Sequence, residues 1–298
     1  MAASGQASTA AGRAGRKPEA RAGLNYAREY EMGDLFIRHA VDGHPEDRYF
    51  FMHIHERCEI FCFVSGEAEY LVEGARYPLE PGSLVLMSPL ESHRTRILES
   101  RPYERFALNF SVSAVESIDP QRLLLKPFFD RPPGRGNLYG PSELSGVCPV
   151  SSLREICEEK MDDYERRIRL LTYLLFLMER LRDAYTRRGA ADYRPPESLA
   201  EHIAAYINSH LFEELSVPML AERFSLSVSQ FGKIFRNAAG AAPWEYVTAK
   251  RLNAAREKMR GGASAREAGE SCGFGDYSAF YRAYVKYFGC APKCDIQR

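Results

Sequence analysis

The last hundred residues contain the same supersecondary pattern twice, which restricts this part of the chain to a small helical fold. The first copy, LSVPMLAERFSLSVSQFGKIFRNAAG, covers 215–240, and the second, ASAREAGESCGFGDYSAFYRAYVKYFG, covers 263–289. Each copy predicts a short helix, a tight turn and a second helix that begins at a capping residue. Two such hairpins in tandem are far more specific than one. We therefore predict an all-α domain over 198–298.

The second helix of each copy has an apolar face and a polar face. Ser227 with Gln230 predicts a capping box in the first copy, and Asp276 predicts an N-cap in the second. Aromatic residues recur at helical spacing on the face that we expect to be buried, namely Phe231, Phe235, Phe280, Tyr284, Tyr287 and Phe288. The opposite faces carry the candidate DNA-binding residues Ser229, Gln230, Lys233, Arg236, Tyr277, Ser278, Tyr281, Arg282 and Lys286. A helix–turn–helix with such a face is typical of a DNA reader.

The segment between the two copies carries positive charge that the whole-chain total hides. PWEYVTAKRLNAAREKMR, 243–260, predicts one long helix with Pro243 in its first turn. Over 233–260 there are seven Lys or Arg and two acids, although the chain as a whole has 40 of each sign. This local excess favours contacts with DNA phosphates, and Lys250 and Arg251 are the candidates on the long helix.

A strand-rich region lies earlier, from about Leu35 to Phe110. The runs EIFCFV, AEYLV and SLVLMS are rich in β-branched and aromatic residues, and turn signals at Ser65-Gly66, Glu73-Gly74 and Pro81-Gly82 separate them. This pattern predicts a meander of short antiparallel strands that closes into a barrel or sandwich. If 52–64 is a strand, His53, His55 and Glu59 share one of its faces.

A helical pattern follows from about Ser142. Spacings of three and four alternate along a possible a/d seam formed by Leu171, Leu174, Met178, Leu181 and Tyr185. Two interpretations stay open: the helix packs on its own barrel, or the seam joins two copies in a dimer. Pro195 and Pro196 then stop any helix and predict a linker, and the Ala-, Gly- and Ser-rich opening predicts a disordered tail.

The C-terminal motifs resemble the DNA-binding domain of the AraC/XylS family of bacterial transcription regulators. The resemblance rests on LAERFSLSVSQFGKIFRNAAGAAPWEYV, RLNAARE, CGFGDYSAFYRAYVKYFG and the closing AP. It implies seven helices, two of which enter successive major grooves on one face of DNA. Gly232, Ala268 and Gly269 depart from the family pattern, which usually has a longer side chain, a larger aliphatic residue and Ala at these positions. We expect a glycine within a helix to cost about 1 kcal/mol relative to alanine.

The N-terminal motifs resemble those of the cupin barrel. They read His53-x-His55-x3-Glu59-x6-Gly66 and Gly82-x6-Pro89-x3-His93. Because AraC-family members commonly carry a cupin-like barrel that binds a small effector, the resemblance implies His53, His55, Glu59 and His93 as effector-binding residues. The same four side chains would suit Mn, Fe, Ni or Zn, so a divalent transition metal is the alternative to a barrel without a cofactor. For Glu59 alone, an ion pair with Arg57, Arg94 or Arg96 is another interpretation.

Together these patterns predict an α+β chain of two domains. The expected parts are a disordered tail (1–23), a cupin-like effector-binding antiparallel β-barrel (24–130), a helical dimerisation segment (131–190), a linker (191–197) and an AraC-type DNA-binding domain with two helix–turn–helix motifs (198–298). We expect a homodimeric regulator that is not an enzyme, with double-stranded DNA, a small-molecule effector and, for an activator, RNA polymerase as partners. The alternative is a cupin-type metalloprotein, either an enzyme or a metal sensor, that carries the helical domain.

Two features of the composition bear on location. Seven cysteines form no paired framework, and an odd number fits a reducing cytoplasm. The longest apolar run, LLTYLLFLM at 170–178, is too short to span a bilayer. We therefore expect a cytoplasmic protein with no membrane partner.

Overall fold

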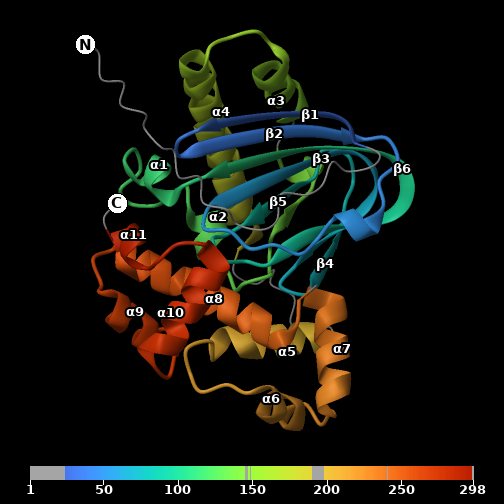
Figure 1. The fold of residues 1–298 in the computed structure, drawn as a ribbon. Helices are drawn as coiled ribbons and strands as arrows, with labels where there is room; N and C mark the ends of the chain where they lie inside the picture. The colour runs from blue at the N-terminus through green and yellow to red at the C-terminus, as the bar shows by residue number, and fades with distance from the viewer. Residues whose placement is uncertain (1–23, 145–146, 148, 190–197, 240, 297–298) are drawn as a thin grey trace, which may run out of the picture. The chain divides into compact units, whose positions relative to one another are not determined.

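The computed structural model of the chain describes residues 24–144, 147, 149–189, 198–239 and 241–296 (Figure 1). The predicted tail, 1–23, and linker, 191–197, lie outside the described residues. The chain divides into two compact units. One comprises the described residues of Ala20–His210 together with Leu215–Val247, and the other comprises Leu211–Glu214 together with the described residues of Thr248–Arg298.

The first unit is built on an antiparallel sheet, as the sequence predicts. Within the described residues the strand order is β1-β2-β6-β3-β5-β7, and β4 pairs with β3. The strands are β1 (Leu24–Met32), β2 (Leu35–Asp42), β3 (Cys58–Val72), β4 (Ala75–Pro78), β5 (Leu84–Met87), β6 (His93–Phe110) and β7 (Leu138–Tyr139). Two long strands, β3 and β6, pair at the centre of this order.

The central strands are longer than the predicted meander of short strands. β3 has 15 residues and β6 has 18, and Gly66 lies inside β3 instead of in a turn. The register between the two strands shifts between Phe63 and Ala68, which marks an irregularity of the β-bulge kind. Gly66 has a φ of +121°, and a Cβ there would lie 3.1 Å from the Tyr103 ring. The glycine therefore serves the bulge, whereas Glu73-Gly74 does form the predicted turn between β3 and β4.

Alternate residues of β3 enter two different cores, as the two-residue period of a strand requires. Ile60 and Cys62 pack with helical residues on one face of the sheet. Phe61 and Phe63 pack on the other face with Tyr70, Val85 and Tyr103. Cys58 and Cys62 thus lie in the core on the face opposite to Phe61 and Phe63.

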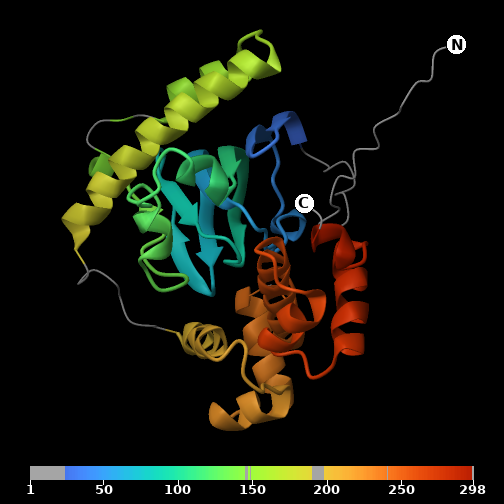
Figure 2. The same ribbon diagram turned by 90° about the vertical axis from the view of Figure 1, so that its left-hand side faces the viewer.

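Helices cover the first of these faces. The helical pattern that follows from about Ser142 forms two helices, α3 (Pro149–Glu158) and α4 (Asp163–Arg188). Asp162 caps α4 by accepting a hydrogen bond from the backbone N–H of Glu165. Figure 2 shows α3 and α4 along one side of the sheet. The predicted seam belongs to this core, because Leu174, Met178 and Leu181 are fully buried in it and Leu171 and Tyr185 pack against it. The seam therefore packs on its own sheet.

A buried ion pair holds the segment between β6 and β7 against the sheet. This segment contains α1 (Val112–Glu116) and α2 (Lys126–Phe129). Arg131 donates to both carboxylate oxygens of Glu91, at 2.7 and 2.8 Å, and to the carbonyl oxygen of Leu86 at 3.1 Å. Both side chains are almost fully buried. Burial alone would raise the pKa of Glu91, but the Arg131 guanidinium holds it below its usual range.

Seven helices lie within the described residues after 198, which is the number that the family resemblance implies. They are α5 (Leu199–Ser209), α6 (Val217–Arg223), α7 (Val228–Ala239), α8 (Pro243–Arg260), α9 (Ala265–Ser271), α10 (Tyr277–Phe288) and α11 (Lys293–Ile296). No helix in the described part of the chain is both long and apolar enough to cross a membrane.

The second unit has its own core and a central arginine. Leu252, Met259, Phe280 and Tyr284 are buried in this core. Arg251 donates to the backbone carbonyls of Leu211, Glu213 and Gly273, at 2.7, 2.6 and 2.6 Å. These hydrogen bonds join residues 211–214 to α8 and to the turn before α10.

Candidate functional site

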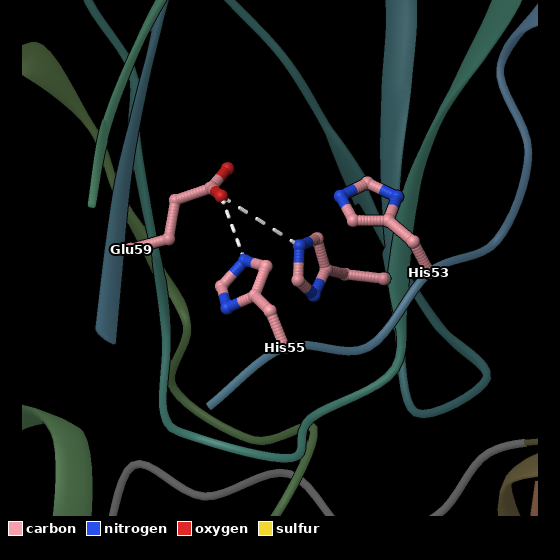
Figure 3. A group of neighbouring side chains, drawn as sticks. His53, His55 and Glu59 are labelled. Atoms are coloured by element: carbon pink, nitrogen blue, oxygen red, sulfur yellow. Dashed lines mark hydrogen bonds and ion pairs between the residues drawn. The ribbon is translucent and has the colours of Figure 1, made fainter. Parts of the chain in front are cut away.

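The four predicted N-terminal site residues come together in space. The ligand atoms of His53, His55, Glu59 and His93 all lie within 4.8 Å of one another. Figure 3 shows the side chains of His53, His55 and Glu59 pointing toward one another. The sequence thus identified the cluster correctly.

The reason that we gave for this convergence is wrong. β3 begins only at Cys58, so His53 and His55 precede the strand. His53 forms instead an isolated antiparallel bridge with His93, with backbone N···O distances of 3.1 and 3.0 Å. The bridge places the histidine-bearing segment next to the start of β6, and this pairing cannot be inferred from alternation along one strand.

Glu59 is the buried centre of the cluster, with 5% of its surface exposed. Its Oε2 lies 3.0 Å from His55 Nε2 and accepts a hydrogen bond of 2.6 Å from Asn109 Nδ2. Its Oε1 accepts a hydrogen bond of 3.3 Å from the Tyr70 hydroxyl. Burial alone would raise the pKa of Glu59, but the interactions with His55 and His93 hold it well below its usual range. We therefore expect an ionised carboxylate near neutral pH.

The ion-pair interpretation of Glu59 is wrong. The three arginines that it invoked pair with other acids: Arg57 with Glu31, Arg94 with Asp47, and Arg96 with Glu69. Sequence reasoning also missed Asn109 as a member of the site. Asn109 lies directly opposite Glu59 in the β3–β6 ladder, so only knowledge of the strand register could have found it.

All three histidine rings are oriented by backbone carbonyls. The Nδ1 atoms lie 3.1, 2.9 and 2.8 Å from the carbonyl oxygens of Phe51, Arg57 and Glu91 for His53, His55 and His93 respectively. Since a carbonyl oxygen only accepts, each Nδ1 carries the proton, and a neutral ring then offers the lone pair of Nε2. Histidines that bind metal ions usually donate their other ring N–H to a carbonyl or carboxylate group, so this donor set fits a metal ion.

The first candidate recognition helix, α7, begins as predicted. The Ser227 hydroxyl accepts a hydrogen bond of 3.2 Å from the Gln230 N–H, and the Gln230 side chain accepts one of 3.0 Å from the Ser227 N–H. Phe231 and Phe235 are fully buried. The predicted reading residues Ser229, Gln230, Lys233 and Arg236 are all exposed.

The second candidate recognition helix, α10, is capped by Asp276, which accepts a hydrogen bond of 2.7 Å from the Ala279 N–H. Of the predicted reading residues, Ser278, Tyr281, Arg282 and Lys286 are exposed. Tyr277 is only partly exposed, because it packs against the core of the second unit. Tyr287 was expected on the buried face but is 36% exposed.

The two candidates for phosphate contacts on α8 are buried, so the structure does not support this role for them. Lys250 and Arg251 are only 5% and 4% exposed, and Arg251 is engaged with three backbone carbonyls. Helical periodicity could have predicted the burial of Arg251. It lies one turn before Ala255 and two turns before Met259, which are both fully buried. The positive charge of this segment is thus used partly within the protein.

Comparison with known proteins finds two family matches in the chain. Residues 37–145 match a family described as an AraC-like ligand binding domain, and residues 220–298 match one described as a helix-turn-helix domain. The chain belongs to the AraC family of transcription regulators. The fold observed here, an antiparallel sheet domain followed by a helical domain, agrees with this assignment.

The chain is similar to several named regulators. It is 32% identical over 88 residues to the probable transcriptional regulator LumQ of Photobacterium leiognathi. These residues cover 29% of this chain and 36% of LumQ. It is 28% identical over 158 residues to the transcriptional activator RhaS of Salmonella arizonae. These residues cover 53% of this chain and 55% of RhaS. The matches thus span about a third to about half of these relatives.

Solved structures show a more distant likeness. ToxT of Vibrio cholerae is 11% identical, with 89% of this chain and 98% of ToxT covered and a TM-score of 0.34. The DNA-binding domain of AdpA, solved with a target DNA, is 25% identical, with 33% of this chain and 89% of that domain covered and a TM-score of 0.32. Neither likeness assigns a role to any residue here.

Proposed function

We propose that this chain is a sequence-specific DNA-binding regulator of transcription that responds to a small molecule bound in its sheet domain. One observation carries the proposal: α7 and α10 are both capped helices with an aromatic buried face and a polar or cationic exposed face. Exposed donors at the start of a helix are what base edges in the major groove require.

We propose that the DNA-reading residues are those candidates whose side chains are exposed. On α7 they are Ser229, Gln230, Lys233 and Arg236, and on α10 they are Ser278, Tyr281, Arg282 and Lys286. Tyr277 supports α10 more than it reads DNA, because its ring packs against Phe280, with 6.1 Å between centroids. Gln230 has a double role, since its side-chain oxygen caps α7 while the rest of the side chain is exposed.

The effector proposal rests on the cluster around Glu59. The face of the sheet that bears it is lined by aromatic side chains, including Tyr70, and the cluster offers donors and acceptors that fix the orientation of a small molecule. An effector acts only if it binds two arrangements of the protein with different affinities. We further propose a cytoplasmic homodimer that contacts RNA polymerase if it activates, and that is not an enzyme. The relatives that match are transcription regulators, which favours regulation over the alternative of a metal-dependent enzyme.

Selection of binding sites from a randomised double-stranded DNA library tests the proposal with the full chain. We expect enrichment of one sequence motif, and an affinity for it that falls steeply with salt concentration as phosphate contacts require. Binding without enrichment would leave only a non-specific DNA binder. No binding at low salt would overturn the proposal.

A further inference from the structure

We propose that His53, His55, Glu59 and His93 bind one divalent transition-metal ion. The site lies where β3 and β6 meet the segment that precedes β3, and it is independent of the DNA-binding surface proposed above. Its ligand atoms lie within 4.8 Å of one another, so a single ion can reach all four. Three further observations support an ion over a simple hydrogen-bonded cluster.

The first observation is that the cluster contains too many acceptors. Because backbone carbonyls take the Nδ1 proton of each ring, Nε2 of a neutral ring is an acceptor. The Nε2 atoms of His55 and His93 lie 3.0 and 3.8 Å from Glu59 Oε2. Asn109 Nδ2 lies 3.3 Å from His55 Nε2, as expected when that nitrogen is an acceptor. Two acceptors, His55 Nε2 and Glu59 Oε2, then lie 3.0 Å apart. A proton on His55 relieves this contact but leaves His93 Nε2 without a partner, whereas one metal ion can bind both nitrogens and the carboxylate.

The second observation is an unpartnered buried nitrogen. The His93 ring is fully buried, and its Nε2 forms no hydrogen bond with any described residue. The nearest carboxylate oxygen, Glu59 Oε2, is 3.8 Å away, which is too long for a hydrogen bond. Buried polar atoms in native proteins almost always have a partner, and an ion at the centre of this cluster would supply one.

The third observation is that every proposed ligand is held in place by a second group. Backbone carbonyls orient the three rings, and Asn109 and Tyr70 donate hydrogen bonds to the two oxygens of Glu59. Such outer contacts fix ligands and tune metal affinity. His53 is the exposed member of the set, so the ion has a path of entry from solvent.

The donor set indicates which metal ions fit. Three imidazoles and one carboxylate suit Mn, Fe, Co, Ni or Zn better than Ca or Mg, which prefer oxygen ligands. No thiolate is expected in the coordination sphere, because Cys58 and Cys62 lie in the core on the opposite face of the sheet. For a fixed set of N and O ligands, Ni and Zn should bind more tightly than Mn.

The experiment uses the full chain, stripped with a chelator and then titrated with Zn²⁺, Ni²⁺ or Mn²⁺ in a calorimeter. We expect saturable binding of about one ion per chain, a rise in the melting temperature on binding, and tighter binding of Zn²⁺ and Ni²⁺ than of Mn²⁺. Cobalt substitution adds a spectroscopic test, since the absorption spectrum should show nitrogen and oxygen ligands only. Absence of saturable binding, or a thiolate-to-cobalt band, would overturn the proposal.

Variants of the proposed ligands, with a matched control, test where the ion binds. His93→Ala should abolish binding at the wild-type site, and Glu59→Gln, which keeps the size of the side chain, should weaken it strongly. His44→Ala removes an exposed histidine of the same unit outside the cluster and should leave binding unchanged. Asn109→Ala should lower the affinity by about 10- to 100-fold through the orientation of Glu59. Circular dichroism confirms that each variant is folded. Equal binding by folded Glu59→Gln and His44→Ala would show an adventitious surface site and overturn the assignment.

Discussion

Arg282 is the single residue on which the DNA-reading proposal can be tested most sharply. It is exposed on α10 and forms no ion pair with any described residue, so its guanidinium is free to grip guanine O6 and N7 together. Arg282→Ala should cost about 1–3 kcal/mol of binding free energy on the selected site and relax specificity at one base pair. Fluorescence anisotropy on the selected and on a scrambled duplex measures both effects.

The control for this variant is Arg101→Ala, which removes an exposed arginine on β6. Its binding to both duplexes should match that of the wild-type chain. If Arg282→Ala instead loses the same affinity on both duplexes, or loses none, Arg282 does not read a base.

Two helical glycines depart from the family pattern in the sequence, and their surroundings predict opposite effects of alanine. A Cβ at Gly232 would meet nothing within 4 Å, so Gly232→Ala should stabilise the protein by about 1 kcal/mol. A Cβ at Gly269 would lie 2.9 Å from Phe280 Cγ, so Gly269→Ala overpacks this contact. Overpacking costs about 1–3 kcal/mol, which cancels or exceeds the stability gained by replacing a helical glycine with alanine. Urea unfolding of the two variants measures the difference. Equal stabilisation by both would show that α9 and α10 are not in this close contact.

At the scale of the element, Arg251 offers a test that separates a structural role from a DNA contact. Arg251→Met should cost at least about 1.5–3 kcal/mol of stability, the range for one hydrogen bond to a charged group, because three carbonyls lose their donor. Arg266→Met, at an exposed pair with Glu270, should cost less than about 1 kcal/mol. Neither folded variant should change the salt dependence of DNA binding. A slope that falls by about one for Arg251→Met would restore the phosphate contact that we reject.

The sequence predicts some helices and strands better than others. The accuracy depends on how far apart in the sequence the interacting residues lie. The beginnings of α7 and α10 depend on caps three residues away, as for Ser227 and Asp276, so local spacing is sufficient. The long strands depend on pairing across the sheet. Gly66 has the local signal of a turn, yet the partner strand holds it within a bulge against Tyr103. Asn109 joins Glu59 for the same reason, through register and not through spacing.

At the scale of the whole molecule, we predict that the C-terminal hundred residues fold without the sheet domain, because their aromatic side chains pack mainly on one another. An aromatic series links α5 to α8: the rings of Tyr206, Phe224, Phe231, Phe235 and Tyr246 follow one another at centroid distances between 5.2 and 6.5 Å. The residues after Thr248 have a separate core around Phe280. The first set also has a polar contact with the sheet domain, because Glu73, in the turn after β3, accepts hydrogen bonds from Tyr246 and Asn208.

A fragment of residues 194–298 should therefore be helical and cooperative in thermal unfolding, and it should bind the selected DNA site. A fragment of residues 24–190 should be mainly β with a helical end and should not bind DNA, because the exposed faces of α7 and α10 are missing from it. Circular dichroism and anisotropy at low salt check both fragments. Any effector or metal response of DNA binding should disappear in the 194–298 fragment, since it lacks the Glu59 cluster. A fragment that is unfolded, or that folds but fails to bind DNA, would show that the sheet domain is needed to complete the DNA-binding domain.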